Sequence, residues 1–418
     1  MNPSVASLRS TATIRQRARA LLERARRGES AHFSIKDGAM VAAATLVADL
    51  TKARYPDLKI PYHSRWRHFE AGGIDRLALF NAQLGDVTAA ERARAQIDLA
   101  LVSVLLDAGA GADWRYLESS ESGTTASAAS HEYTRSEGLG VASFHAFISG
   151  LFSSDPAKPL QADAKGLQGV TAERLADAFQ VTAANPLVGL DGRAALLRRL
   201  GKSLEDQPDL FGNPGRPGHL FDHLVKTTDG GATLRAHDLL SVLLTGLAPV
   251  WPAQNSLDGV ALGDCWRLAA AVAEPGDDPA TDGWMPFHKL SQWLTYSLLE
   301  PFQWAGVTVD GLDALTGLPE YRNGGLFLDA GVLQLKDPAE ASKRHQAGDA
   351  LIVEWRALTV ALLDELAPLV RVHLGLTAAQ MPLACVLEGG TWAAGRVLAQ
   401  QLHGGQPPLN IESDGTVF

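Results

Sequence analysis

The feature of this sequence that most constrains its fold is a helical spacing of apolar residues that recurs along the chain. In residues 12–28, Ile14, Ala18, Leu21 and Leu22 fall on one side of a helix and arginines on the other. Comparable patterns predict helices over residues 35–53, 88–109, 137–152, 171–182, 236–247, 286–302, 347–374 and 389–402. Strand patterns are few, with one short candidate at residues 327–332. We therefore predict a mainly α fold with minor β, in a single large helical domain.

Residues 201–235 are rich in Gly, Pro and Asp and include the turn-forming run GNPGRPGH at 212–219. No charge run or long linker flanks this stretch, so it is a weak candidate for a domain boundary. The chain is accordingly predicted to form one domain over residues 1–418. The alternative is two helical lobes that meet near residues 201–235.

The charge and cysteine content exclude several classes of protein. With 37 Lys and Arg against 47 Asp and Glu, the formal net charge is −10, which argues against a general nucleic-acid binder. Cys265 and Cys385 lack the spacing of a disulfide framework or a zinc site, so both are expected to be buried thiols. No apolar run approaches the roughly 20 residues of a membrane-spanning helix. We expect a cytoplasmic protein that acts on a small molecule, alone or as a homo-oligomer, without membrane, nucleic-acid or cofactor partners.

The most informative stretch covers residues 286–327. Its first half predicts an amphipathic helix in which His288, Gln292 and Tyr296 share one face, with Lys289 beside them. A hydrogen-bonding stripe on an otherwise apolar helix indicates a polar pocket. A solvated face with a snorkelling lysine gives the same pattern, and the stripe alone favours that simpler interpretation.

The second half of the stretch contains LPEYRNGGLF, in which Pro319 and the paired glycines predict a tight loop. Such a loop presents a carboxylate, a phenol and a guanidinium in succession, from Glu320, Tyr321 and Arg322. The three groups can converge on one ligand. The alternative is that Glu320 and Arg322 pair at the surface, where an ion pair contributes little.

Two further polar clusters are candidates for a site. The first combines His63, Arg65, Trp66 and His68, and the second comprises Asp107, Glu118, Arg135 and Glu137. The first cluster suggests a pocket wall that stacks on a planar ligand, or packed core aromatics with surface arginines. Its two histidines fit one helix face poorly, and no third His or Cys stands at matching spacing, so no metal site is predicted. The GxG at residues 109–111 lacks a Walker lysine or Rossmann spacing, so no nucleotide loop is predicted.

Several blocks of the sequence resemble the uracil-catabolism protein 4 family of fungi and bacteria. They are PYHSRWRHFE, SVLLDAGAGADWRY, RSEGLGVAS, LTGLAPVWP, FHKLSQWL, LTGLPEYRNGGLF, EGGTWAAGR and the terminal SDGTVF. The resemblance extends over nearly the whole chain. It implies a role in a pathway that breaks down uracil through a ribosylated urea intermediate.

A weaker resemblance relates KLSQWL and LTGLPEYRN to queuosine-salvage N-glycosidases, which are helical proteins similar to DNA glycosylases. Those enzymes carry a lysine-alanine-glutamine helix followed by an aspartate-tyrosine-arginine loop, whose aspartate is the catalytic carboxylate. Position by position, Glu320 takes the place of that aspartate, Tyr321 and Arg322 match the loop, and Lys289 and Gln292 match the helix. The Glu-for-Asp difference, and Asn323 and Gly324 where the relatives have an apolar residue and Pro, indicate a different leaving group or a different reaction.

The two resemblances together imply an N-glycosidase that hydrolyses the N-ribosyl bond of a ribosylurea-type nucleotide or a related pyrimidine nucleoside phosphate. Glu320 is then the carboxylate that stabilises or traps an oxocarbenium-like state, or activates water. The candidates to protonate the leaving group are Asp107, Glu118, His63 and His68. The candidates to bind a 5-phosphate are Arg322, Lys289, Arg135 and Arg65. Trp66 or Tyr321 could stack on the planar group. The alternatives are an amidohydrolase of the same pathway, with or without a metal, and a non-enzymatic scaffold with a large exposed apolar patch.

Overall fold

The computed structural model describes residues 2–119, 131–251, 255–273 and 276–412, and it divides into two compact units. Among the described residues, the first unit comprises residues 2–63, 255–273, 276–293 and 311–412. Among the described residues, the second comprises residues 64–251 and 294–310. Residues 201–235 lie inside the second unit, so this stretch does not separate the two units. One domain over residues 1–418 remains a prediction.

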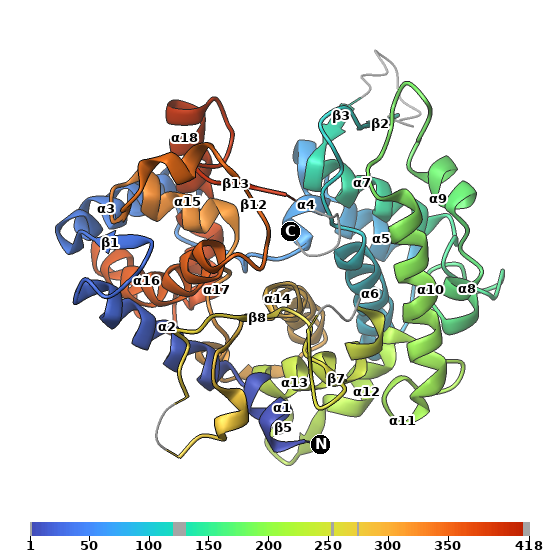
Figure 1. Cartoon of the computed structure of the whole chain (residues 1–418). Helices are drawn as coiled ribbons and strands as arrows, with labels where there is room; N and C mark the ends of the chain where they lie inside the picture. Colours follow the sequence, from blue (N-terminus) through green and yellow to red (C-terminus); the bar gives the residue numbers. More distant parts are fainter. Residues whose placement is uncertain (1, 120–130, 252–254, 274–275, 413–418) are drawn as a thin grey trace. The chain divides into compact units, whose positions relative to one another are not determined.

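The first unit is built mainly of helices (Figure 1). They are α1 (Pro3–Leu8), α2 (Thr11–Arg26), α3 (Met40–Arg54), α15 (Tyr321–Asp329), α16 (Ala350–Leu374), α17 (Leu383–Val386) and α18 (Trp392–His403), with a π turn, η8 (Leu387–Thr391), before α18 and 3-10 turns at Asp37–Ala39, Pro279–Thr281, Leu312–Ala314 and Pro338–Ser342. Its short strands pair as β1 (Phe33–Ile35) with β11 (Leu333–Leu335), β6 (Ser256–Leu257) with β7 (Val260–Ala261), β8 (Cys265–Arg267) with β9 (Trp284–Pro286), and β12 (Arg344–His345) with β13 (Asn410–Ile411).

Helix α16 forms the centre of the first unit. Every residue from Leu351 to Leu363 is buried, and a helix that is apolar nearly all round must be covered by neighbours. Helices α2, α3 and α15 pack against it. The buried charges of Arg356 and Glu354 interrupt this apolar surface, and such charges are retained only where partners compensate them.

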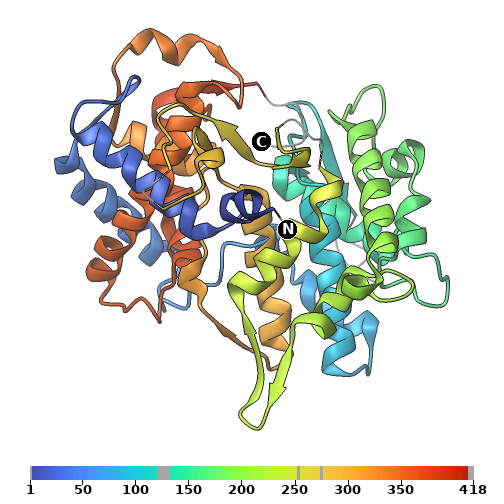
Figure 2. The same ribbon diagram turned by 60° about the horizontal axis from the view of Figure 1, so that its bottom comes forward.

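The second unit is also mainly helical. Its helices are α4 (Trp66–Phe69), α5 (Arg76–Leu84), α6 (Ala89–Leu105), α7 (Arg135–Ile148), α8 (Ala164–Gln168), α9 (Ala172–Ala178), α10 (Leu190–Asp206), α11 (Pro208–Phe211), α12 (Leu220–Leu224) and α13 (Ala236–Gly246), with 3-10 turns at Ala71–Gly73, Pro217–His219 and Ala248–Val250. Strand β2 (Arg115–Glu118) pairs with β3 (His131–Thr134), and β5 (Gly231–Arg235) pairs with both β4 (Lys226–Thr228) and β10 (Thr308–Asp310). The β4–β5 hairpin projects from the helices (Figure 2). Helix α14 (Lys289–Trp304) begins in the first unit and continues into the second.

The predicted helical class is confirmed, because the described strands have only two to five residues each. Two helices begin at an N-cap threonine whose side chain bonds to the first turn. The Thr88 side chain accepts a hydrogen bond from the Glu91 N–H at 3.1 Å, and Thr171 accepts from the Arg174 N–H at 3.2 Å. Similarity to the DNA-glycosylase fold stays a prediction.

Two local predictions are wrong. LPEYRNGGLF does not form a loop, because Tyr321–Asp329 is helix α15. The strand predicted at residues 327–332 is likewise helical up to Asp329, and the extended segment comes later, at Leu333–Leu335. The paired glycines do not form a turn: Gly324 leaves room for the Trp355 side chain of α16, and Gly325 lies against Pro408.

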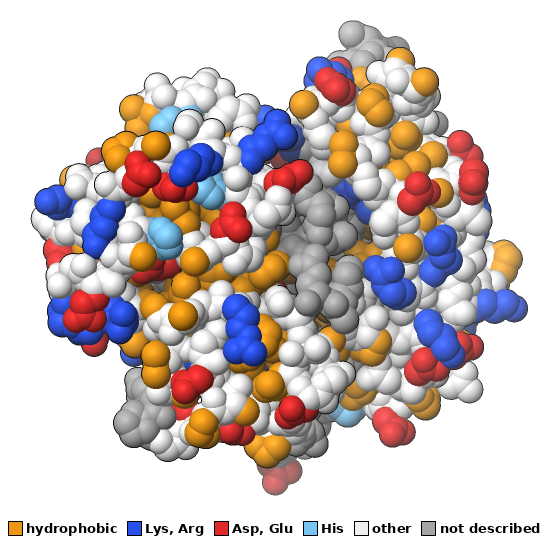
Figure 3. Space-filling view, viewed as in Figure 1, with side chains coloured by type: hydrophobic (Ala, Val, Ile, Leu, Met, Phe, Trp, Pro, Cys, Tyr) orange, Lys and Arg blue, Asp and Glu red, His pale blue; other side chains and the backbone are white. Residues whose placement is uncertain are grey.

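Cys265 and Cys385 are buried free thiols, as predicted. Within the described residues, no helix is both long enough and apolar enough to cross a membrane. On the face shown in Figure 3, the described Lys and Arg side chains are interspersed with Asp and Glu. The terminal SDGTVF block of the resemblance lies outside the described residues.

Candidate active site

Glu320 is the N-cap of helix α15. It has an extended backbone, and its carboxylate accepts hydrogen bonds from the backbone N–H groups of Arg322 at 2.8 Å and Asn323 at 2.5 Å. These are two of the donors that a helix start leaves without an intrahelical partner. Glu320 is only 9% exposed. The structure therefore buries a carboxylate at the positive end of a helix dipole.

The surroundings of Glu320 perturb its acidity in opposite directions. Burial raises the pKa of Glu320, whereas the N–H groups of Arg322 and Asn323 and the charges of Lys289 and His63 lower it, and the net pKa is raised. Three of the predicted site residues, Glu320, Lys289 and His63, thus belong to one electrostatic cluster in the first unit. A buried carboxylate with nearby cations is a common feature of functional sites.

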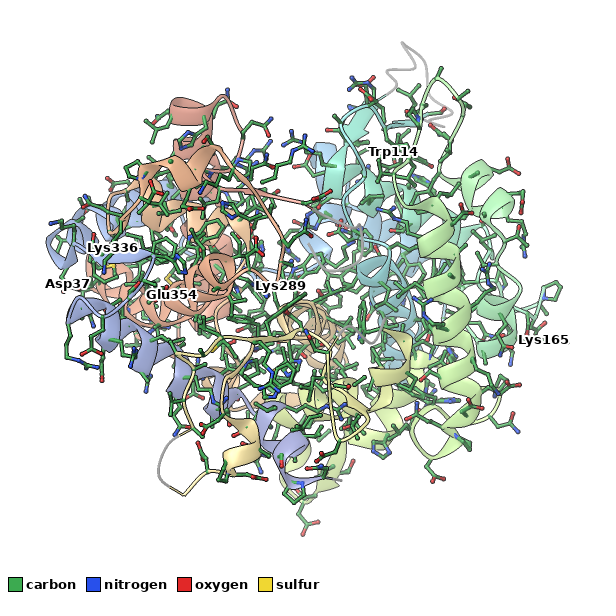
Figure 4. All side chains as sticks on the ribbon, in the orientation of Figure 1. Asp37, Trp114, Lys165, Lys289, Lys336 and Glu354 are labelled. Carbon is green, nitrogen blue, oxygen red and sulfur yellow. The ribbon has the colours of Figure 1, made fainter. Side chains whose placement is uncertain are left out.

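Lys289 is the first residue of α14 (Figure 4). A buried ion pair between Asp264 and Arg356 holds its backbone. The Asp264 carboxylate accepts the Lys289 backbone N–H at 3.0 Å, the Trp266 indole N–H at 2.7 Å and both Nη groups of Arg356 at 2.8 Å. Burial alone would raise the pKa of Asp264, but the charge and hydrogen bonds of Arg356 hold it well below its usual range. Arg356, from the central helix α16, therefore fixes where α14 begins.

Gln292 supports the segment that leads to Glu320. It is fully buried, and its Oε1 accepts the Thr316 backbone N–H at 2.9 Å while its Nε2 donates to the Thr316 hydroxyl. One turn earlier, the buried His288 ring pairs with the Leu8 carbonyl oxygen at 2.9 Å. The predicted polar stripe is thus buried and bonded within the protein. A solvated face is not what produces the pattern.

His63 contacts a second buried carboxylate, Glu388. His63 Nδ1 lies 2.8 Å from Glu388 Oε2, and Glu388 Oε1 accepts from Arg54 Nη2 at 2.7 Å and from the Tyr55 hydroxyl at 2.9 Å. Burial would raise the pKa of Glu388, but the hydrogen bond and charge of His63 and the charge of Arg54 lower it to about 2. Glu388 is therefore an ionised anchor for the His63 ring.

Glu388 belongs to the π turn η8, an irregularity that is frequent at functional sites. Arg54 also donates to the backbone carbonyl oxygens of Glu388 and of Gly389, the latter at 3.1 Å. A side chain at Gly390 would overlap the Val47 carbonyl oxygen of α3. The glycine therefore allows the π turn to lie directly against α3, which ends at Arg54.

The segments that carry the Glu320 and Glu388 carboxylates are in direct contact. Asn323, in the first turn of α15, donates to the Leu318 carbonyl oxygen at 3.0 Å and accepts from the Thr391 hydroxyl at 2.9 Å. Thr391 is the last residue of the π turn, and a side chain at Gly395 would overlap the Arg322 carbonyl oxygen. PEYRNGG and EGGTWAAGR thus form two close-packed elements that carry Glu320 and Glu388.

Tyr321 and Arg322 follow Glu320 in α15. The Arg322 guanidinium carbon lies 4.8 Å from the centroid of the Tyr321 ring, and its Nη groups make long hydrogen bonds of 3.4 Å to the Gly405 carbonyl oxygen. Within the described residues, no ion pair joins Arg322 to Glu320, and the buried Arg322 Nε has no partner. The alternative of a surface pair between Glu320 and Arg322 is therefore wrong.

The second unit contains the other predicted residues, and several are occupied by internal contacts. Arg65 is fully buried and pairs with Asp107 at 3.1 Å. Trp66 is 2% exposed, donates to the Ser297 carbonyl oxygen at 2.8 Å and packs edge-on against Trp304. Core packing accounts for Trp66 without a ligand, which was the simpler of the two sequence interpretations.

Glu118 is an ion-pair partner. Its carboxylate pairs with the buried Arg76 and with His145. Burial would raise the pKa of Glu118, but hydrogen bonds from Arg76 and His145 lower it. An ionised carboxylate cannot donate a proton, which argues against Glu118 as the predicted acid. His68 lies in α4 and is partly buried, whereas Arg135 and Glu137 are exposed in the first turn of α7.

Sequence reasoning missed Arg54, Tyr55 and Glu388. Glu388 stands in one of the blocks that carry the family resemblance, and this was the only available signal. Within the described residues, no group of three or more His, Cys, Asp or Glu side chains is arranged to hold a metal ion.

Comparison with known proteins adds a family and two similar relatives. A family model described as "Protein of unknown function (DUF1688)" matches residues 7–418. Protein urg3 of Schizosaccharomyces pombe is 40% identical over 423 residues, which cover 99% of each chain. Uracil catabolism protein 4 of Lachancea kluyveri is 38% identical over 418 residues, covering 94% of this chain and 93% of the relative.

Proposed function

Because the chain belongs to the DUF1688 family and resembles uracil catabolism protein 4 over almost its full length, we propose that it acts in uracil catabolism as an N-glycosidase. The proposed substrate is a ribosylurea-type nucleotide or a related pyrimidine nucleoside phosphate. The products are urea or a base, together with ribose or ribose phosphate.

The observation that carries this proposal is the buried Glu320 carboxylate at the start of α15. Burying a carboxylate costs free energy unless partners compensate it, and here burial outweighs them and raises the pKa of Glu320. A residue that opposes stability in this way is expected where the chemistry needs it. Two backbone N–H groups fix the orientation of the carboxylate without neutralising it.

Cleavage of an N-ribosyl bond develops positive charge at the anomeric carbon. A fixed carboxylate in a poorly hydrated site stabilises that charge, and it can also take a proton from the attacking water. Lys289 and Arg322 supply cations in the same unit for an anionic 5-phosphate. The leaving nitrogen must gain a proton as the bond breaks.

The test is a substrate panel. Purified protein is incubated with ribosylurea 5-phosphate, ribosylurea, uridine monophosphate and uridine, and urea, uracil, ammonia and reducing sugar are measured. We expect urea or uracil release matched by sugar. Glu320→Gln, which keeps an oxygen for the helix cap, should reduce release by about 100- to 1000-fold, the usual effect of losing one electrostatic group.

Asp75→Asn is the matched control, because Asp75 caps α5 through the Ala78 N–H at 2.9 Å and is exposed. It should leave release unchanged. Ammonia without sugar would indicate an amidohydrolase instead. No product from any substrate would favour a scaffold, and full activity in Glu320→Gln would remove the proposed role of this residue.

A further inference from the structure

The His63–Glu388 pair is arranged to control one ring nitrogen and leave the other available. Nδ1 is engaged by Glu388 Oε2 at 2.8 Å, and no described protein atom is hydrogen-bonded to Nε2. The side chain is 13% exposed, so the ring is sheltered but still reachable. A carboxylate on one imidazole nitrogen keeps the proton there, so the other nitrogen can give or take a proton.

Glu388 has more partners than a simple ion pair requires. Oε1 receives Arg54 and Tyr55, at 2.7 and 2.9 Å, and Oε2 is left for His63. Arg54 also donates to the backbone carbonyl oxygens of Glu388 and Gly389, so it holds both the side chain and the backbone of Glu388. Such outer hydrogen bonds orient a working side chain and tune its basicity.

The charge of His63 lowers the pKa of Glu320, so the two side chains lie near each other in the first unit. A hydrolytic step at an anomeric carbon needs one group for the water and the developing charge and another for the leaving nitrogen. Glu320 fills the first role in the proposed function. The second needs a group that can carry a proton at neutral pH, and His is the side chain suited to this task.

We propose that His63 is the general acid for the leaving group and that Glu388, held by Arg54 and Tyr55, is its positioning residue. This inference rests on the proposed N-glycosidase function. His63, protonated on both nitrogens, gives its Nε2 proton to the leaving nitrogen while the C1′–N bond breaks and its electron pair departs with that nitrogen. Water forms the new C1′–O bond and gives a proton to Glu320. Solvent then carries that proton back to His63, so one water is consumed and both side chains are restored.

The rival explanation is structural, in which the His63–Glu388 pair only fastens the segment between α3 and α4 to the π turn. The two explanations differ in leaving-group dependence. A general acid matters for urea or uracil, which leave poorly without a proton, and matters little for 4-nitrophenolate, which leaves as an anion. A structural pair would affect both substrates alike.

The experiment measures, for each variant, the rate of product release from two substrates. One is the N-ribosyl substrate that the wild type cleaves, and the other is the corresponding 4-nitrophenyl riboside. His63→Asn keeps an N–H donor for Glu388 and removes the Nε2 position. It should lower urea or base release by about 100- to 10000-fold and nitrophenol release by no more than about threefold. Glu388→Gln should show the same selectivity with a loss of about 10- to 100-fold. In His63→Ala, added imidazole should restore part of the urea or base release.

His403→Asn is the matched control, because His403 pairs with Asp329 at 2.8 Å in the same unit. It should leave both rates unchanged, and urea unfolding checks that every variant is folded. Equal losses on both substrates, or no loss in His63→Asn, would overturn the assignment while leaving the N-glycosidase proposal intact. A wild type that cleaves no N-ribosyl substrate would overturn both.

Discussion

Replacing Glu320 by Gln and by Ala separates the two tasks of this carboxylate, capping α15 and carrying a charge. Ala removes the only described acceptor for the Arg322 and Asn323 N–H groups at a site that is 9% exposed. We expect it to lower the free energy of unfolding by about 2 kcal/mol, the upper end for a lost helix cap.

Gln should behave differently, because it keeps one acceptor oxygen and removes a buried charge. Losing the favourable interaction of the charge with the helix dipole costs about 0.3–1 kcal/mol, and relief of the burial penalty offsets it. The free energy of unfolding of Glu320→Gln should therefore stay within about 1 kcal/mol of the wild type. Urea titration at pH 7, read by circular dichroism, measures both variants.

The pH dependence gives a second test of the same reasoning. The pKa of Glu320 is raised above 4.5 in the folded protein. Its contribution to stability is therefore fully present below pH 4.5 and is lost as the pH rises through the folded value. The wild type should lose stability relative to Glu320→Gln over that range. A wild type that instead gains stability relative to Gln, or a Gln variant as unstable as Ala, would refute the argument that burial dominates at this site.

Three further substitutions test the surrounding structure, each by urea unfolding. Arg356→Met leaves the buried Asp264 carboxylate without its cation and should lower the free energy of unfolding by about 3–5 kcal/mol, and a loss under 1 kcal/mol would contradict the buried ion pair. Glu388→Gln should lower it by about 3 kcal/mol at pH 7, since the pKa of Glu388 falls from 4.5 to about 2 on folding. This difference from the wild type should shrink as the pH falls from 4.5 toward 2, and a constant difference would contradict the lowered pKa. Gly395→Ala should cost about 1–3 kcal/mol because its methyl group overlaps α15, whereas Gly192→Ala, which meets no atom within 4 Å in the first turn of α10, should be neutral or stabilising by up to about 1 kcal/mol.

The helices could be predicted because their determinants are local. The apolar spacing in α2 and α16 and the Thr88 and Thr171 caps act within one or two turns of chain, so neighbouring residues suffice to specify them. The same local reasoning failed at α15. A Glu in place of the usual cap residues and a pair of glycines predicted a loop. The glycines are instead required by contacts with residues far away in the chain, which the local sequence does not show.

In the candidate site too, local sequence could predict some features, and tertiary contacts decided the others. From the sequence alone, Glu320, Lys289 and His63 could be singled out, since residue type and resemblance to known families suffice to nominate a carboxylate, an ammonium and an imidazole. Their arrangement depends on partners far away in the chain, as His63 and Glu388 are 325 positions apart. No periodicity links such positions, because tertiary packing brings them together. The His63 backbone N–H donates to the Ala384 carbonyl oxygen of α17 at 3.0 Å, and the π turn with Glu388 directly follows α17. The sequence by itself determined the helices and the chemical groups, and tertiary packing decided which of those groups are buried, paired and oriented for a reaction.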